Sequence, residues 1–288
     1  MFKAKKALGQ NFISDPQIIE EIVSASEAGT FDTVVEIGPG KGALTCTLAE
    51  RAGRVIAVEL DSSVIPLLKG NLAGAENVEV VNEDILKFDW SRAVQNGAVS
   101  PATENQCAQN AKAGKPCDPG VLRIIGNLPY YITTPILLGI LEKNVPAESI
   151  TVMVQKEVAE RIVAKPGGKD YGVLSVSLQY YADCRKVLDV PAEYFDPRPK
   201  VDSAVVHLVL RKERLFVAGS EEEKKYFAVV KAAFSQRRKT LLNSLAANYG
   251  KQRVSEALKA SGIESSRRPE TLAIEEFRAL TEALEGAL

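Results

Sequence analysis

The fold is decided by residues 34–42, which read VVEIGPGKG. Three of the first four are β-branched and apolar, as in a buried strand, and they lead into a turn with glycine at every second position. Helical spacing follows over Ala43–Ala52. This order of strand, glycine-rich turn and helix predicts a ligand site in a parallel sheet, because glycines let a ligand approach the backbone closely.

Short runs rich in Val and Ile recur beyond this stretch. They predict strands at Thr33–Ile37, Arg54–Leu60, Val78–Val81, Leu122–Ile125, Ser149–Val154, Lys186–Val190 and Ala204–Leu210. Ala43–Ala52 and Ser62–Asn71 carry helical spacing between the first three strands, and this rhythm predicts a parallel sheet with right-handed crossovers. Further helices are predicted at Lys156–Ala164 and Leu174–Tyr181.

The two ends of the chain depart from this pattern. Lys3–Ile13 is a basic arm, and Ser14-Asp15-Pro16 predicts a helix start. From Lys212 onward only helices are predicted, at Glu221–Ala233, Lys239–Asn248, Arg253–Ser261 and Ile274–Leu284. We therefore expect one domain over residues 1–211 and a small all-helical domain over residues 212–288. Residues 91–120, rich in Ala, Asn, Gln, Pro and Gly, predict a mobile insertion.

The composition excludes several classes of protein. The 288 residues are 45% hydrophobic and 25% charged with a net charge of −1, so nucleic-acid binding must rest on local basic clusters. The four cysteines form no CxxC pair and there is one histidine, so we expect no metal site. No apolar run can span a membrane and no secretory signal is recognisable, so we expect no membrane partner and a cytoplasmic location.

Two carboxylates extend the glycine-rich turn into a candidate cofactor site. Glu59 ends the second predicted strand about 20 residues after Gly38, where a carboxylate can accept both ribose hydroxyls of a nucleoside. This pair alone leaves NAD and S-adenosylmethionine open. The spacing of Gly38 and Gly40 is GxGxG rather than the GxGxxG of pyrophosphate sites, which favours S-adenosylmethionine. Asp84, at the end of the third strand, is a candidate acceptor for the cofactor adenine amine, and Glu36 fits an amine-bearing cofactor.

Residues 126–131, GNLPYY, are the most specific chemical signal. The N6 amine of adenine is a poor nucleophile, because its lone pair is delocalised into the ring. The Asn127 amide oxygen and the Leu128 carbonyl are candidate acceptors for its two hydrogens, which would make the nitrogen more pyramidal. Pro129 would stiffen the turn, and Tyr130 would stack on the base. The cofactor carries the activated methyl, so catalysis is mainly positioning for in-line transfer.

The Asn-Leu-Pro-Tyr tetrapeptide, joined to the Glu-x-Gly-x-Gly-x-Gly pattern, resembles the adenine-N6 methyltransferases. Three further segments resemble the small-subunit ribosomal RNA adenine dimethyltransferase family: QNF at residues 10–12, FDPRPKVDS at 195–203 and FSQRRK at 234–239. The resemblance extends from about Leu8 to Leu284. It implies an α/β fold, with a Rossmann-like, doubly wound methyltransferase sheet and a small all-helical C-terminal domain.

The resemblance also implies roles for single residues. At the S-adenosylmethionine site it places Asn11, Ile13, Gly38, Glu59, Asp84 and Asn127. It places Phe195 on the target adenine, opposite Tyr130. The implied reaction converts two adjacent adenines near the 3′ end of small-subunit RNA into N6,N6-dimethyladenine, within a pre-30S particle and by a monomer.

Basic clusters supply the expected contacts to RNA phosphates. The candidates are Arg198, Lys200, Arg237, Arg238 and Lys239. Arg198 stands where the family often has proline, and the insertion at residues 91–120 is longer than the family pattern predicts.

Three rival functions stay open on the sequence. A large-subunit RNA adenine methyltransferase of the macrolide-resistance type shares the cofactor motifs and the tetrapeptide, but the PKVDS and RRK segments favour the small subunit. An RNA-binding assembly factor without catalysis is disfavoured by the intact tetrapeptide. A nicotinamide oxidoreductase is disfavoured by the glycine spacing.

Overall fold

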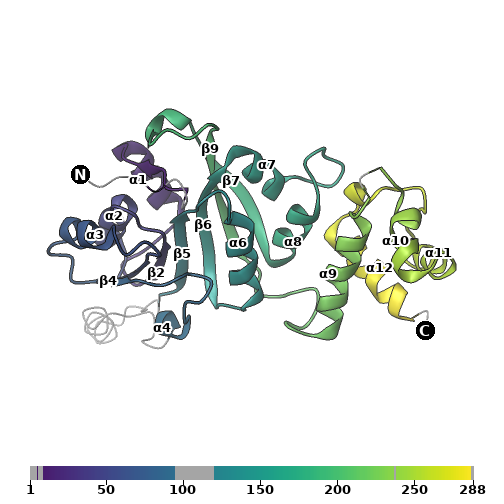
Figure 1. The fold of residues 1–288 in the computed structure, drawn as a ribbon. Coiled ribbons are helices and arrows are strands. Elements are labelled where there is room, and N and C mark those ends of the chain that lie inside the picture. Colours follow the sequence, from purple (N-terminus) through teal and green to yellow (C-terminus); the bar gives the residue numbers. More distant parts are fainter. Residues whose placement is uncertain (1–4, 6–8, 95–119, 237, 287–288) are drawn as a thin grey trace. The chain divides into compact units, whose positions relative to one another are not determined.

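A computed structural model describes residue 5 and residues 9–94, 120–236 and 238–286. The chain divides into two compact units (Figure 1). The first unit comprises Met1–Ala159 and Arg185–Leu210, and the second comprises Glu160–Cys184 and Arg211–Leu288. The second unit resumes at Arg211, close to the predicted domain boundary, and it also takes in a segment that the sequence pattern had assigned to the first domain.

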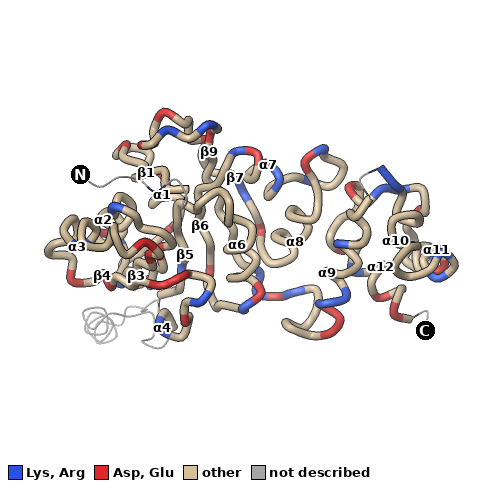
Figure 2. The backbone as a smooth tube through the Cα atoms, viewed as in Figure 1, with Lys and Arg blue, Asp and Glu red and all other residues tan. Residues whose placement is uncertain are grey.

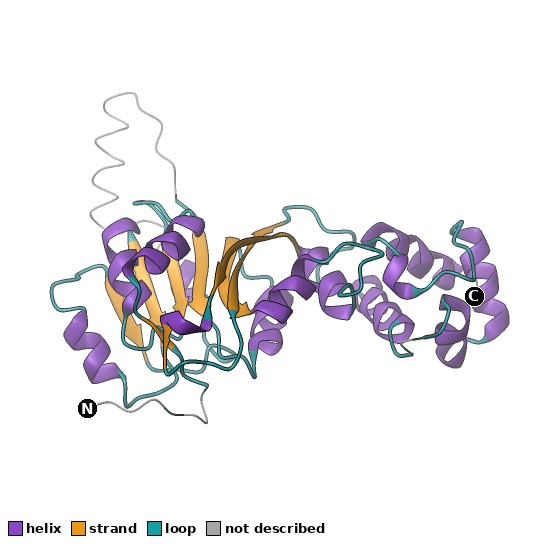
Figure 3. Cartoon of the chain, turned by 90° about the horizontal axis from the view of Figure 1, so that it is seen from above, coloured by secondary structure: helices purple, strands orange, loops and turns teal. Residues whose placement is uncertain are grey.

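The first unit is built on a seven-stranded sheet with the order β4-β3-β2-β5-β6-β9-β7. Its strands are β2 (Thr33–Ile37), β3 (Arg54–Val58), β4 (Val78–Val81), β5 (Leu122–Asn127), β6 (Ala147–Gln155), β7 (Ala182–Val190) and β9 (Ser203–Leu210). The pairs β2–β3, β3–β4, β2–β5 and β5–β6 are parallel, whereas β6–β9 is antiparallel. Helices flank the sheet (Figure 3), and the predicted doubly wound fold is confirmed.

The strand order reverses between β2 and β5. From β2 the chain proceeds through β3 to β4 at one edge and then returns to β5 on the other side of β2. Ligands of open α/β sheets bind where the order reverses, outside the carboxyl ends of the strands. The turn after β2, at residues 38–42, therefore lies where the topology favours a ligand.

The first unit contains six α-helices among its described residues, and α1 begins where the sequence predicts. They are α1 (Pro16–Ala25), α2 (Ala43–Arg51), α3 (Ile65–Asn71), α4 (Ser91–Val94), α6 (Thr133–Glu142) and α7 (Lys156–Val163), the last of which continues into the second unit. The Asp15 side chain accepts hydrogen bonds from the backbone amides of Gln17 and Ile18 and caps α1, which has proline in its first turn. Of the predicted insertion, only its start, α4, and Gly120 lie among the described residues.

A second, two-stranded sheet ties the basic arm to a distant segment. β1 (Phe12–Ile13) pairs antiparallel with β8 (Phe195–Asp196), so that Ile13 lies opposite Phe195. Both side chains are buried and belong to the core cluster that includes Ile22, Leu48 and Val55. The arm is thus anchored by apolar burial at its Ile13 end.

The second unit is helical in its described residues, apart from the start of β7. Its elements are α8 (Val173–Tyr181), α9 (Glu221–Ala233), α10 (Leu241–Tyr249), α11 (Lys251–Ala260), the short η3 (Pro269–Thr271) and α12 (Ile274–Gly286). Two buried tyrosines of this unit are paired: the Tyr180 hydroxyl donates to Glu223 at 3.0 Å, and the Tyr171 hydroxyl donates to the Leu272 carbonyl at 2.9 Å. The predicted helical C-terminal region is confirmed.

Two features are missing from the described residues. No helix there is long and apolar enough to cross a membrane. No group of three or more His, Cys, Asp or Glu side chains could hold a metal ion in that part of the chain.

Candidate active site

A pocket lies at the carboxyl ends of the central strands. It is lined by residues that follow β2, β3, β4 and β5, and by residues 9–13 of the arm. Among its lining residues are the predicted Asn11, Ile13, Gly38, Gly40, Glu59, Asp84, Asn127, Leu128, Pro129 and Tyr130. The structure therefore brings together side chains and turns from five separate parts of the sequence, in the place that the topology favours.

The glycine-rich turn holds the Glu59 carboxylate from one side. The backbone amide of Gly40 donates to Glu59 Oε2 at 3.0 Å, and the amide of Asp61 donates to Oε1 at 2.8 Å. Burial raises the pKa of Glu59, and these two hydrogen bonds oppose the rise. Because each carboxylate oxygen can accept more than one hydrogen bond, Glu59 keeps acceptor capacity for a diol.

Gly40 also determines how closely the arm approaches this turn. Its φ is +56°, and a Cβ there would lie 2.7 Å from the Phe12 ring. Any other residue would strain the turn and push the ring away. The Lys41 ammonium lies 4.6 Å from the centre of the same ring.

Glu36 is a buried carboxyl group on the pocket wall with an unpaired oxygen. It is 1% exposed, and Oε2 has no hydrogen-bond partner among the described residues. Burial raises the pKa of Glu36 to about 8, and the nearby Glu59 adds to the rise. A buried carboxyl oxygen without a partner is unfavourable, so its position favours a ligand that carries positive charge. S-adenosylmethionine is such a ligand, and these residues fit it.

Asp84 follows β4, on the same side of the glycine turn as Glu59, because β3 and β4 both lie on one side of β2. Its Oδ1 accepts a hydrogen bond from the Leu86 amide at 3.0 Å, which fixes the carboxylate at the pocket. Asp84 is partly exposed, so its second oxygen is accessible to a ligand amine. Its role as an adenine acceptor stays a prediction.

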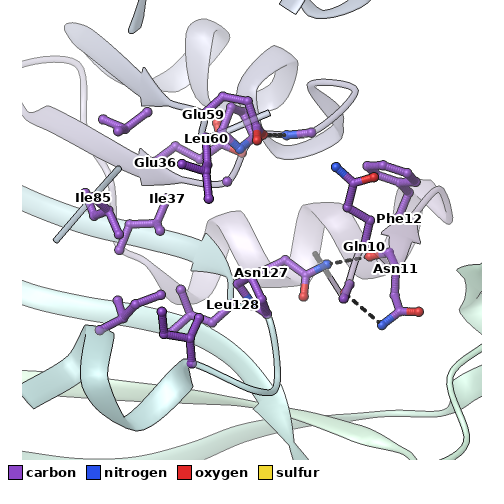
Figure 4. Close-up of a pocket in the computed structure, with 18 of the residues that line it drawn as sticks. Gln10, Asn11, Phe12, Glu36, Ile37, Glu59, Leu60, Ile85, Asn127 and Leu128 are labelled. Atoms are coloured by element: carbon purple, nitrogen blue, oxygen red, sulfur yellow. Dashed lines mark hydrogen bonds between the residues drawn. The ribbon is translucent and has the colours of Figure 1, made fainter. Parts of the chain in front are cut away.

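The Asn127 amide has a defined orientation. Its Nδ2 donates to the backbone carbonyl of Asn11 at 2.8 Å, so the nitrogen is occupied by the arm (Figure 4). Oδ1 accepts no hydrogen bond from the described part of the chain. The amide oxygen is thus the group available to an incoming amine, as the chemistry of N6 transfer requires.

The rest of the tetrapeptide is fixed by neighbouring elements. The Leu128 amide donates to the Met153 carbonyl at 3.1 Å, and the Pro129 carbonyl accepts from the Ile132 amide at 3.1 Å. The Tyr130 hydroxyl lies 2.6 Å from Ser203 Oγ, which joins the tetrapeptide to the PKVDS segment. Burial raises the pKa of Tyr130, so its ring is uncharged at neutral pH.

Two aromatic residues differ from the sequence-based expectation. Phe195 is only 5% exposed, packs in the core cluster and is not among the residues lining the pocket. In this structure it does not present a free ring opposite Tyr130, and its stacking role stays a prediction. Tyr131 was missed, although it lines the pocket and is 60% exposed. Its position directly after the tetrapeptide was the available signal.

The candidate RNA contacts fall in two exposed segments. Arg198 and Lys200 lie exposed between β8 and β9, whereas Arg238 and Lys239 lie exposed in the turn before α10. Arg237 lies outside the described residues. Figure 2 shows the distribution of charge along the chain.

A profile of the family described as "Ribosomal RNA adenine dimethylase" matches residues 1–285. The chain belongs to this family. It is 44% identical to ribosomal RNA small subunit methyltransferase A of Alkaliphilus oremlandii over 98% of this chain and 92% of the relative. It is 48% identical to the protein of the same name from Desulfitobacterium hafniense, with the same coverage.

A solved structure of the 23S rRNA methyltransferase ErmE is also similar. It has a TM-score of 0.68 and 29% identity, and the match covers 96% of this chain and 100% of that chain. Like other ribosomal RNA adenine dimethylases, this protein is an S-adenosylmethionine-dependent methyltransferase, which confirms the predicted enzyme class and cofactor. When bound, S-adenosylmethionine supplies an activated methyl group, and we propose that Glu36, Glu59 and Asn127, which line the pocket, would provide the charge and acceptors around it.

Proposed function

We propose that this ribosomal RNA adenine dimethylase transfers methyl groups from S-adenosylmethionine to N6 of two adjacent adenines near the 3′ end of small-subunit (16S) RNA. The product is N6,N6-dimethyladenine. The enzyme acts as a monomer on a pre-30S particle in the cytoplasm, as part of small-subunit biogenesis.

The orientation of the Asn127 amide carries this proposal. With Nδ2 held by Asn11, Oδ1 is presented as an acceptor beside the Leu128 carbonyl, which also accepts no hydrogen bond within the described residues. Two acceptors can bind both hydrogens of an adenine amine and localise its lone pair on nitrogen. Tyr130 supplies an aromatic face in the same pocket.

The choice of the small subunit is supported by the relatives. The two relatives named for the small subunit are 44% and 48% identical to this chain, whereas the structure named for 23S rRNA is 29% identical. The Ser203 hydroxyl of the PKVDS segment lies against Tyr130, so a segment that resembles the small-subunit family contacts the reactive tetrapeptide.

Residues 1–211 would form the methyltransferase domain and residues 212–288 the RNA-binding domain, with the second unit presenting a basic surface to RNA. The Leu241 amide donates to the Arg267 carbonyl at 2.8 Å, and the Gly167 amide donates to the Glu270 carbonyl at 2.7 Å. These bonds join three loops whose exposed basic side chains we name the basic face: Lys165, Lys169, Arg238, Lys239 and Arg268. Lysine and arginine side chains of this kind bind phosphates.

Arg267, the neighbour of Arg268, has a different role. Its guanidinium contacts both oxygens of Glu276, with Nη2–Oε2 at 3.0 Å, and donates to the Thr271 carbonyl at 2.6 Å. Arg267 therefore stabilises the loop, whereas Arg268 is 56% exposed and its nearest carboxylate in the described chain is 3.8 Å away.

The test is to incubate the enzyme and S-adenosylmethionine with under-methylated small subunits and, separately, with large subunits. Mass spectrometry of the digested RNA should show N6,N6-dimethyladenine at two adjacent positions of the small-subunit RNA alone. Methylation of large-subunit RNA would instead identify the enzyme as a large-subunit RNA adenine methyltransferase of the macrolide-resistance type. Only N6-methyladenine at saturation would refute dimethylation, and failure to bind the cofactor would favour a non-catalytic assembly factor.

A further inference from the structure

Asp61 is a buried carboxylate next to the cofactor pocket to which the motifs assign no role. It follows β3 by three positions and is 3% exposed. Its Oδ1 accepts from the Lys5 ammonium at 2.7 Å, and its Oδ2 accepts from Gln10 Nε2 at 2.9 Å. Both donors belong to the N-terminal arm, so one carboxylate binds the arm at two points.

The charge on Asp61 is secured by further donors. Burial alone would raise the pKa of Asp61, but hydrogen bonds from Lys5, Ser63 and Gln10 hold it well below its usual value. Asp61 is therefore ionised at neutral pH. A charge-assisted hydrogen bond to a buried carboxylate is stronger than one between neutral groups.

The arm carries this anchorage to the Asn127 amide. The Lys5 amide donates to Gln10 Oε1 at 2.8 Å, so both ends of the Gln10 side chain are occupied and Nε2 is directed at Asp61. The next residue, Asn11, accepts the hydrogen bond from Asn127 Nδ2 through its backbone carbonyl. Two hydrogen bonds and the Gln10–Asn11 peptide bond thus connect Asp61 with Asn127. Figure 4 shows Gln10 and Asn11 on the arm, with Asn127 facing them.

We propose that Asp61 is a positioning residue, which holds the arm across the pocket and thereby keeps the Asn127 amide oxygen turned toward the reacting amine. The proposal rests on the function proposed above, because it needs Asn127 as an acceptor. Without the arm, the Asn11 carbonyl leaves Nδ2, and the amide can present its NH2 group as readily as its oxygen. An NH2 group cannot accept the hydrogens of adenine N6.

The described residues of the arm have few other anchors near Asn127. Ile13 is fixed by the core cluster, and Phe12 lies against Gly40 and Lys41. Segments with few buried contacts open locally at low cost in free energy. Loss of the Asp61 bonds should therefore free residues 9–11 while leaving the sheet intact.

The experiment compares Asp61→Asn and Lys5→Met with Ser63→Ala. Ser63 donates to Asp61 Oδ1 from both its amide and its hydroxyl, at 3.0 and 2.6 Å, so Ser63→Ala perturbs Asp61 without touching the arm. Two quantities are measured on the full chain: hydrogen exchange of the amides of residues 9–13, and the single-turnover rate of methyl transfer to small subunits at saturating S-adenosylmethionine.

We expect Asp61→Asn to speed exchange in the arm and to lower the saturated rate about tenfold, equal to about 1.4 kcal/mol. Lys5→Met should do the same to a smaller extent. The double variant should lose less of the rate than the two single losses added together, because both substitutions remove the same Lys5–Asp61 hydrogen bond. Ser63→Ala should retain wild-type exchange and rate.

The two readouts separate the possible failures. Wild-type exchange and rate in both Asp61→Asn and Lys5→Met would overturn the proposal. So would equal losses in Ser63→Ala, because the effect would then act through the start of α3. If Asp61→Asn fails to fold, Lys5→Met decides alone. If wild-type enzyme transfers no methyl group to small subunits, the proposed function fails. The hydrogen-exchange data would still show whether Asp61 holds the arm.

Discussion

The cofactor pocket and the basic face of the second unit use charge in opposite ways. In the pocket Glu36 and Glu59 are buried, and Glu59 is fixed by two backbone amides. On the basic face Lys165, Lys169 and Arg238 are exposed. Buried, fixed groups select one small ligand by geometry, whereas exposed cations bind a polyanion through a force that salt screens. The two regions should therefore respond differently to mutation, to salt and to pH.

The largest effect should come from the pocket acceptor. Asn127→Ala should lower the single-turnover rate by about 100- to 1000-fold, as does removal of a preorganised polar group that acts in a transition state. Cofactor affinity should fall less, because Glu59 and the glycine turn remain. Asn248→Ala, an exposed asparagine of α10, is the control. Turnover equal to wild type in Asn127→Ala would show that this amide does not take part in methyl transfer.

The next effect concerns affinity within the same pocket. Glu59→Ala should raise the cofactor dissociation constant at least about tenfold, equal to about 1.4 kcal/mol, because two ribose hydroxyls lose their acceptor. Calorimetry measures it, and Glu59→Gln, which keeps one acceptor oxygen, should lose less. RNA affinity should not change. An unaltered cofactor dissociation constant in Glu59→Ala would show that Glu59 does not bind the ribose hydroxyls.

A smaller effect on affinity, but a distinct salt response, is expected on the basic face. Neutralising Arg237, Arg238 and Lys239 should weaken RNA binding several-fold at low salt and reduce the slope of log K against log salt by about 2. Cofactor affinity should stay unchanged. RNA-binding titrations at several salt concentrations measure the slope.

The matched control for that variant is Lys224→Ala with Lys225→Ala on α9. These lysines pair with Glu221 and Glu285, so their loss should alter the slope less. A wild-type slope in the triple variant would mean that the turn before α10 does not contact RNA phosphates.

The smallest effect should be the pH dependence of cofactor binding through Glu36. With a pKa of about 8, Glu36 is largely protonated at pH 7 in the empty enzyme, and a cationic ligand favours its ionised form. Cofactor affinity should therefore rise between pH 7 and pH 8.5 by no more than about eightfold, the increase in the ionised fraction of Glu36, with proton release visible by calorimetry in buffers of different ionisation enthalpy. Glu36→Gln should abolish this rise, whereas Glu50→Gln, on the exposed side of α2, should retain it.

The same group predicts how stability varies with pH. The folded, cofactor-free protein keeps a proton on Glu36 between about pH 4.5 and 8 that the unfolded chain releases. Its contribution to the free energy of unfolding therefore falls as the pH rises through this window. Glu36→Gln should be more stable than wild type at pH 8 by about 4 kcal/mol, and nearly equally stable near pH 4.5. Chemical denaturation at the two pH values tests this.

Sequence patterns predicted the sheet and the helical region well, because apolar periodicity reports burial directly. β2 and β4 have the predicted bounds, and α9 spans Glu221–Ala233 as expected. Helix α6 (Thr133–Glu142) was missed, because apolar residues lie on most sides of the helix and form no clear apolar stripe. The pairing of β1 with β8 was missed because two-residue strands carry no pattern of their own.

At the site, motifs predicted which residues line the pocket but not how they are held. Asn11 and Asn127 were both expected there. No sequence pattern predicts, however, that the Asn127 side-chain amide donates to the Asn11 backbone carbonyl. Asp61 and Tyr131 were missed, since single polar or aromatic residues become informative only with their burial and neighbours. Phe195 was expected in the site by resemblance, and its burial means that Phe195→Ala would test packing as well as stacking.

The pairing of β1 with β8 has a consequence for the order in which parts of the enzyme fold. The arm precedes its partner strand by a stretch of sequence that includes most of the sheet. Contacts of such long range form late, because closing a long loop costs entropy before the contact stabilises anything. A nascent chain that has already formed β2, β3 and the glycine turn still lacks the arm's docking strand. Competence to bind the cofactor should thus arise as one of the last events in the folding of the first unit.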